Sequence, residues 1–233
     1  IDIAIPSEYY SNFQNKNLQS YIILLELTVT KTYQNIISLP YNGIFNEGAT
    51  CYVNSMLQTL NSICSFKKAV FQIPTENDDY SSVALSLQRL FYDLMTNHSP
   101  VSAKILLNSF GWSQEQIQIQ HDVQEFNLLL SDVMQNKMKG TSCDGAYNSL
   151  FEGKLMNYIQ CVNVDYHSER IEKFVDLQLT IKNYKNIYQS LDAYTEEEIL
   201  DNDDKYETEG YGKQEAKKGL RFISFTPVLK IQP

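Results

Sequence analysis

Apolar residues recur at helical spacing in three segments of the first 140 residues. A spacing of three and four residues places side chains on one face of a helix. We therefore predict helices over 51–63, 83–94 and 121–138, and a shorter one within 101–112 that ends at Gly111. The apolar positions are Val53, Met56, Leu57, Leu60 and Ile63, then Val83, Leu87, Leu90, Phe91 and Leu94, then Val123, Phe126, Leu129, Leu130 and Val133.

The pattern changes after residue 150. The segment 151–181 holds two alternating or β-branched stretches separated by charged residues, which predicts a pair of antiparallel strands. We predict a helix over 186–200, a charged loop over 201–219 and a closing strand over 220–232; an isolated strand is also expected at 21–33. Helices followed by strands indicate the α+β class. The chain then divides into an N-terminal segment 1–40, a helical part 41–150 and a strand part 151–233.

Composition narrows the classes of function. The 233 residues are 43% hydrophobic and carry a formal net charge of −9. An acidic chain is a poor candidate for binding nucleic acid through phosphate contacts. The longest apolar run, 21–27, is interrupted by Glu26 and is too short to span a membrane. We therefore predict neither a nucleic-acid partner nor a membrane partner.

The cysteines are few and widely spaced. Cys51, Cys64, Cys143 and Cys161 form no CxxC pair, which argues against a zinc ribbon and a thioredoxin-like site. The chain is also too poor in cysteine for a disulfide scaffold, so we expect a reducing compartment. We predict no metal and no cofactor.

Cys51 lies where the first predicted helix begins. A helix N-terminus favours the thiolate, the nucleophilic form of cysteine. Gly43 and Gly48 allow the preceding turn to approach a substrate closely, and the Asn46 amide has the donors that stabilise an oxyanion in acyl transfer. The alternative is that Cys51 is a small buried hydrophobe. These residues alone leave both interpretations open.

Two motifs resemble those of the ubiquitin-specific proteases. The segment "GIFNEGATCYVNSMLQTL" (43–60) is similar to the cysteine box of that family, with Ile44 in place of its usual Leu. The segment "QHDVQEF" (120–126) is similar to the second family box, Gln-x-Asp-x-x-Glu-Phe. The matching residues of the first box are Gly43, Asn46, Gly48, Thr50, Cys51, Tyr52, Asn54 and Ser55.

The resemblance continues over roughly 41–232 and is greatest to the subfamily of the herpesvirus-associated ubiquitin-specific protease. Segments such as "SLQRLFYDL", "NKMKGT", "YIQC" and "QEAKKGLRF" carry it. In that subfamily a ligand-binding domain precedes the protease, and residues 1–40 are expected to be its tail.

The resemblance implies a papain-like fold with thumb, fingers and palm, 41–150 being the thumb and 151–233 part of the fingers and palm. Such enzymes are thiol proteases that cleave the isopeptide bond after the C-terminal glycine of ubiquitin. Cys51 matches the nucleophile and Asn46 the oxyanion donor. The implied partners are ubiquitin and ubiquitinated proteins, and the implied location is the cytoplasm, the nucleus or both.

The second box implies a site for the arginine-rich tail of ubiquitin. Asp122 and Glu125 match its acidic residues, and their i, i+3 spacing would place both on one helical face. The alternative for this pair is an ordinary solvated face. The remaining residues that match positions near the tail or the cleft are Gln120, Gln124, Tyr52 and Trp112.

The catalytic histidine of the family lies in a Gly-His-Tyr box, and none of His98, His121 and His167 has that context. The chain also begins with Ile1 and stops at Pro233. We therefore expect an incomplete catalytic domain that lacks its general base and is inactive alone. Two alternatives remain: a non-catalytic ubiquitin-binding module or pseudoenzyme, and a papain-type protease for unmodified peptides, which the second box disfavours.

Overall fold

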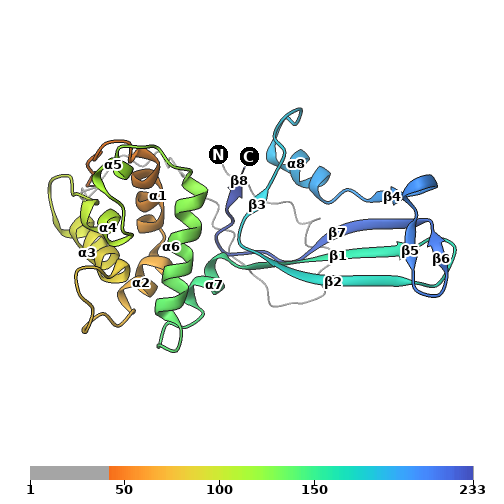
Figure 1. Ribbon diagram of the computed structural model, residues 1–233, viewed down its shortest axis with the longest axis horizontal. Coiled ribbons are helices and arrows are strands. Elements are labelled where there is room, and N and C mark those ends of the chain that lie inside the picture. The colour runs from red at the N-terminus through yellow and green to blue at the C-terminus, as the bar shows by residue number, and fades with distance from the viewer. Residues whose placement is uncertain (1–41, 233) are drawn as a thin grey trace, which may run out of the picture. The chain divides into compact units, whose positions relative to one another are not determined.

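The computed structural model describes residues 42–232, which form two compact units, 42–150 and 151–232 (Figure 1). The predicted strand at 21–33 and the N-terminal segment 1–40 lie outside the described residues. The first unit is helical and the second contains the sheet, so the α+β class is confirmed.

The helical unit packs its helices around large apolar side chains. Its core includes Val53, Leu57, Phe66, Phe91, Phe126 and Leu130. The helices are α1 (Cys51–Ser62), α2 (Cys64–Phe71), α3 (Val83–Thr96), α4 (Lys104–Ser109), α5 (Gln114–Ile117), α6 (Val123–Met138) and α7 (Ala146–Phe151), the last ending at the boundary between the units.

The sequence pattern located α1, α3, α4 and α6 but missed α2 and the short helices α5 and α7. Helix α1 ends because Ile63 takes an extended conformation, with φ −80° and ψ 97°, and α2 starts at the next residue. Helix α4 ends before Gly111, whose φ of +81° favours glycine.

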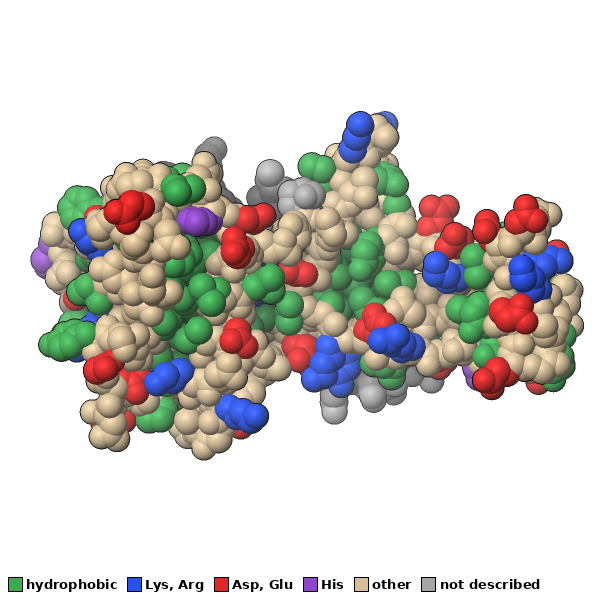
Figure 2. All heavy atoms as spheres, viewed as in Figure 1, with side chains coloured by type: hydrophobic (Ala, Val, Ile, Leu, Met, Phe, Trp, Pro, Cys, Tyr) green, Lys and Arg blue, Asp and Glu red, His purple; other side chains and the backbone are tan. Residues whose placement is uncertain are grey.

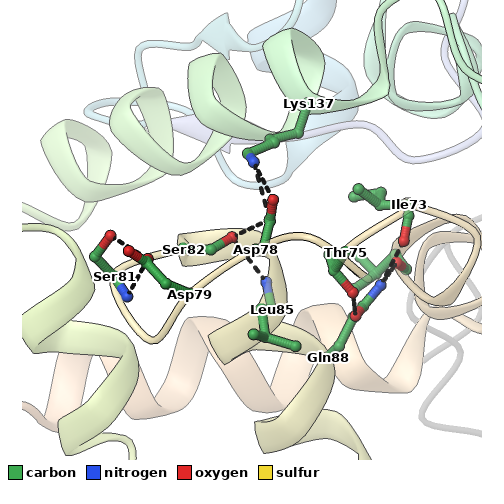
Figure 3. Close-up of polar contacts among 10 residues, drawn as sticks. Ile73, Thr75, Asp78, Asp79, Ser81, Ser82, Leu85, Gln88 and Lys137 are labelled. Atoms are coloured by element: carbon green, nitrogen blue, oxygen red, sulfur yellow. Dashed lines mark hydrogen bonds and ion pairs between the residues drawn. The ribbon is translucent and has the colours of Figure 1, made fainter.

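Helix α3 starts from a polar loop that is fastened to α6 (Figure 3). The Ser82 hydroxyl accepts a hydrogen bond from the Leu85 amide at 3.3 Å, which makes Ser82 the N-cap. The same hydroxyl donates to Asp78, and Asp78 forms an ion pair of 2.9 Å with Lys137 of α6. The loop therefore joins α3 to α6.

The sheet unit is built on an antiparallel ladder (Figure 1). The order of its four-stranded sheet is β2-β1-β7-β4, in which β1 (Gly153–Cys161) and β2 (His167–Phe174) form the predicted antiparallel pair. The other strands are β3 (Leu177–Gln178), β4 (Glu198–Leu200), β5 (Tyr206–Thr208), β6 (Gly212–Gln214), β7 (Ala216–Ser224) and β8 (Ile231–Gln232).

Three predictions in this unit were wrong in part. The predicted closing strand 220–232 is interrupted, because β7 ends at Ser224 and β8 covers only Ile231–Gln232. The predicted helix 186–200 is only α8 (Ile187–Tyr194), because residues 198–200 pair with β7 as β4. The predicted loop 201–219 contains a 3-10 turn at Asn202–Asp204, a hairpin of β5 and β6, and the start of β7.

One face of the sheet carries an apolar cluster, and the other carries aromatic and charged side chains. The cluster contains Leu155, Phe174, Leu177, Leu179 and Leu191, with Leu220 and Phe222 against it. On the opposite face the Tyr158 ring covers Gly219, where an added Cβ would lie 2.4 Å from the tyrosine oxygen. Figure 2 shows acidic and basic side chains mixed over the visible face of this unit.

No helix within 42–232 is long and apolar enough to cross a membrane.

Candidate active site

The turn before α1 is held by the side chain of Asn46. Its amide oxygen accepts hydrogen bonds from the Gly48 nitrogen at 3.3 Å, the Thr50 nitrogen at 3.2 Å and the Thr50 hydroxyl at 3.1 Å. The Thr50 hydroxyl in turn accepts from the Glu47 nitrogen at 3.1 Å. Because the oxygen of Asn46 is occupied by the turn, the NH₂ group is the end of this exposed amide that remains for a substrate.

Cys51 is the first residue of α1, as predicted, and its side chain is exposed. Thr50 is the N-cap but makes no side-chain cap bond, since its hydroxyl is used within the turn. The exposed thiol thus lies at a helix start that no side chain caps. The side-chain amide of Asn54, in α1, donates to the Phe45 carbonyl at 2.9 Å. This bond fixes the segment before Cys51 to the start of α1.

Cys64 provides an internal comparison. It is also exposed and is also the first residue of a helix, α2. Its sulfur lies 4.0 Å from the Ser62 carbonyl oxygen, and the preceding Ile63 offers no side-chain donor. A helix start and exposure are therefore shared by both thiols, whereas the amide of Asn46 in the preceding turn belongs to Cys51.

The turn is supported from behind by the end of α5. The Ala49 nitrogen donates to the Ile117 carbonyl at 3.2 Å, and the Gln118 side-chain nitrogen donates to the Glu47 carbonyl at 3.0 Å. Gly48 has φ +147°, and a Cβ there would lie 2.5 Å from the Gln118 amide nitrogen. Gln118 was not among the predicted site residues, and its place in the sequence, 71 residues from Glu47, gives no local signal.

Tyr52 links Cys51 to the second box. Burial raises the pKa of the Tyr52 phenol, and the charges of Glu125 and Cys51 add to this, while a backbone hydrogen bond from His121 opposes it. Tyr52, a residue of the first box, is therefore also close to His121 and Glu125 of the second box. The phenol is neutral at physiological pH, since its pKa lies above the ordinary value of 10.0.

Trp112 belongs to an aromatic cluster beneath the second box. Its ring stacks on His121 at a centroid distance of 5.1 Å and lies 5.7 Å from Phe126. The His121 Nε2 lies 3.1 Å from the Gln116 carbonyl oxygen. These contacts give Trp112 a packing role and hold the backbone of 121 beside Tyr52.

The structure changes the expected geometry of the acidic pair. Asp122 is not on the helical face of α6 but is its N-cap, and its carboxylate accepts from the Gln124 nitrogen at 2.7 Å. Glu125 lies in the first turn of the helix, where the helix dipole stabilises a negative charge. Asp122 and Glu125 are both exposed, as is Gln120, whereas Gln124 is half-buried. Both carboxylates are therefore available to a cationic ligand. They are presented by the N-cap and the first turn of α6 and not by one face within the helix.

Within 42–232, no three His, Cys, Asp or Glu side chains are placed to hold a metal ion. The four cysteines are free thiols; Cys143 and Cys161 are buried.

Comparison with known proteins assigns this arrangement to a family. A family model described as ubiquitin carboxyl-terminal hydrolase matches residues 42–232. The chain belongs to the ubiquitin carboxyl-terminal hydrolase family. The match covers both boxes and both units.

Curated members of the family are similar to the chain over most of its length. It is 51% identical over 192 residues to ubiquitin C-terminal hydrolase 12 of Arabidopsis thaliana, covering 82% of the chain and 17% of that protein. It is 52% identical over 192 residues to ubiquitin carboxyl-terminal hydrolase 7 of Drosophila melanogaster, with the same two shares. With ubiquitin carboxyl-terminal hydrolase 15 of Saccharomyces cerevisiae it is 43% identical over 223 residues, 93% of the chain and 18% of the relative. The chain thus spans less than a fifth of the length of these relatives.

Proposed function

We propose that the chain is part of a cysteine deubiquitinase that hydrolyses the isopeptide bond at the C-terminal glycine of ubiquitin, with Cys51 as nucleophile. The Cys51 sulfur would attack the glycine carbonyl carbon, and the carbonyl oxygen would become an oxyanion. The general base would take the thiol proton and pass it to the lysine nitrogen. Collapse of the intermediate would then break the C–N bond, release the lysine amine and leave a thioester that water hydrolyses.

The observation that carries this proposal is the turn from Asn46 to Cys51. Asn46 uses its oxygen to hold the turn, so its NH₂ group is the end left to donate to the oxyanion. Removal of one such donor typically costs a factor of about 10²–10³ in rate. The exposed thiol at the uncapped start of α1 supplies the nucleophile beside it.

The second box is proposed to bind the cationic tail of ubiquitin. Asp122 and Glu125 are exposed carboxylates, and Glu125 is close enough to raise the pKa of Tyr52, next to the nucleophile. A tail bound there would lead to Cys51. The proposed contributors from the same region are Gln120, Gln124, Tyr52 and Trp112.

We further propose that the general base is supplied by residues outside this chain and that the 233 residues alone have little activity. His121 directs its Nε2 at the Gln116 carbonyl, His98 lies in the exposed loop after α3, and His167 begins β2 in the other unit. The relatives are more than five times longer than the matched region. The absence of a base would cost about 10²–10⁴ in rate.

Other parts of the proposal rest on sequence resemblance. We assign the chain to the subfamily of the herpesvirus-associated ubiquitin-specific protease, with ubiquitin and ubiquitinated proteins as partners and the cytoplasm or nucleus as location. In this assignment 41–150 is the thumb and 151–233 is part of the fingers and palm.

The test is hydrolysis of a fluorogenic ubiquitin substrate by the 233-residue chain, by the natural full-length protein, and by full-length Cys51→Ala and Cys64→Ala. We expect turnover by the full-length protein and by Cys64→Ala only. Because Cys64 is also an exposed thiol at a helix start, it is a matched control for Cys51.

The same experiment addresses a second candidate function, a non-catalytic ubiquitin-binding module, which the positions of the three histidines favour. Binding of ubiquitin by a full-length protein that shows no turnover would support that function. Turnover that survives Cys51→Ala would contradict the assignment of the nucleophile.

A further inference from the structure

The side chain of Gln118 makes a contact that the motifs do not explain. Its amide nitrogen donates to the carbonyl of Glu47 at 3.0 Å, in the middle of the turn that carries Asn46. The neighbouring Ile117 carbonyl accepts from the Ala49 nitrogen at 3.2 Å. Two hydrogen bonds therefore fasten Glu47 and Ala49, on either side of Gly48, to the end of α5.

We propose that Gln118 is a positioning residue for the reaction, one that holds the turn of Asn46 and Cys51 in the geometry needed to stabilise the oxyanion. This inference rests on the proposed function. Gln118 touches neither substrate nor nucleophile in this role and acts through Glu47 and Gly48.

The packing around Gly48 shows how closely the turn and Gln118 fit. At Gly48, φ is +147°, and an added Cβ would lie 2.5–2.7 Å from three atoms of the Gln118 amide group. Since Gly48 also donates to the Asn46 oxygen at 3.3 Å, a shift of the Glu47–Gly48 peptide displaces one of the contacts that orient the Asn46 amide. Gln118 therefore acts on the donor through the single peptide bond between Glu47 and Gly48.

The chemistry of residue 118 matters as well as its size. A carbonyl oxygen accepts hydrogen bonds but cannot donate one, so only a donor side chain can hold Glu47 in this way. A carboxylate of the same length would place negative charge against the Glu47 carbonyl. Gln118→Glu therefore removes the bond at nearly constant volume, whereas Gln118→Ala removes both bond and side chain.

Two reactions of the same thiol distinguish positioning of the oxyanion turn from a general effect on Cys51. Hydrolysis of a ubiquitin substrate passes through an oxyanion at the carbonyl. Alkylation by iodoacetamide forms an S–C bond as iodide leaves and the thiol proton goes to solvent, and it builds no oxyanion at the attacked carbon. A residue that positions the donor affects the first reaction and leaves the second unchanged.

The experiment uses the natural full-length protein and its variants Gln118→Ala, Gln118→Glu and Gln114→Ala. Gln114 is an exposed glutamine at the start of α5 and serves as the matched control. For each protein, kcat and KM are measured on a fluorogenic ubiquitin substrate, the alkylation rate of Cys51 by peptide mapping, and the melting temperature.

We expect both Gln118 variants to lose about ten- to a hundred-fold in kcat, because small misplacements of catalytic groups have effects of this size. KM, the Cys51 alkylation rate and the melting temperature are expected to stay close to those of the wild type, and Gln114→Ala to behave as the wild type. Unchanged kcat in Gln118→Glu, or an equal fall in kcat and in alkylation rate, would overturn the inference. A wild-type full-length protein without turnover would instead refute the proposed function, and this inference with it.

Discussion

The side-chain oxygen of Asn46 lies 3.2 Å from the backbone nitrogen of Thr50, the residue directly before Cys51. A side chain that resembles a catalytic donor is thus also a structural part of the turn. Substitutions at this position must separate the two roles, because the oxygen holds the backbone and the nitrogen is the proposed donor.

Asn46→Asp keeps an oxygen for Thr50 and removes the NH₂ group. We expect the full-length variant to lose about 10²–10³ in kcat, since one oxyanion donor is gone. KM and the free energy of unfolding should change little. Asn46→Ala should lose similar activity and also stability, because the hydrogen bonds of the turn disappear. Steady-state kinetics and urea unfolding check both; Asn46→Asp with wild-type kcat would remove Asn46 from the mechanism.

Asp122 also has two roles that substitution can separate. Asp122→Asn retains an oxygen for the Gln124 amide and should unfold like the wild type, whereas Asp122→Ala should lose about 1 kcal/mol with the N-cap. Both should weaken binding of ubiquitin by about 1–3 kcal/mol, because each removes a charge-assisted hydrogen bond. Calorimetric titration of the full-length variants with ubiquitin, beside Glu125→Gln, measures this. Wild-type affinity in all three would mean that the carboxylates are only a solvated surface.

Because of the Asp78–Lys137 ion pair, we expect the free energy of unfolding to depend on pH in acidic solution. The hydrogen bond from Ser82, followed by that from Lys137, lowers the pKa of Asp78 below its ordinary value of 3.8. A carboxyl with a lowered pKa stabilises the fold above its unfolded pKa, and this contribution is lost as pH falls through the folded value. Lys137→Met should destabilise by about 0.2–1 kcal/mol near pH 7, as for other partly exposed pairs.

The difference between Lys137→Met and the wild type should shrink below pH 4, and urea unfolding at several pH values measures it. Lys154→Met, at an exposed lysine of β1, is the control. A difference that is constant down to pH 2 would contradict the role of the pair.

Because the side chain of Lys230 is buried, we expect stability to rise with pH in alkaline solution as well. Burial lowers its pKa from 10.5 to about 8, although Asp176 opposes this, and its ammonium lies 4.4 Å from the centre of the Phe151 ring. Between pH 8 and 10.5 the unfolded chain binds more protons at this residue than the folded chain, so stability should rise with pH across that window.

Lys230→Met should remove this rise and stabilise the chain at pH 7 by about 1–3 kcal/mol, because the cost of burying the charge is gone. Urea unfolding at pH 7 and pH 9.5, compared with Lys154→Met, measures the effect. A Met variant that is less stable than the wild type at pH 7 would show that the contacts of Lys230 outweigh its burial.

The sequence predicted the parts of the fold that depend on local pattern. The start of α1 at Cys51 and the β1–β2 pair could be predicted from apolar periodicity, because this pattern can be read within one continuous segment. The β5–β6 hairpin was missed because its strands have three residues each and mostly polar side chains. Strand β4 was taken for helix because its pairing with β7, which includes an ion pair of 3.0 Å between Glu198 and Lys218, is a tertiary contact.

The candidate site shows the same division. Cys51, Asn46 and the second box could be proposed as site residues because each motif is continuous in sequence, and their roles stay predictions. The cap position of Asp122 was missed because the helical pattern could begin at 121 as well as at 123. The support given by Gln118 could not be predicted at all, since it joins residues 71 positions apart.

The turn before Cys51 is bonded to a distant segment of the chain, and this has a consequence for folding kinetics. The Phe45 nitrogen donates to the Val101 carbonyl at 2.8 Å, and the Val101 nitrogen to the Gly43 carbonyl at 2.9 Å. These bonds close the chain between residues 45 and 101 into a long loop. Closing such a loop carries an entropy cost that local helix formation does not. The helices can form early from their own segments, whereas the turn reaches its final shape only when residue 101 has docked. The proposed catalytic geometry is therefore expected to form late in folding, and the exchange rates of these two amide protons should report its completion.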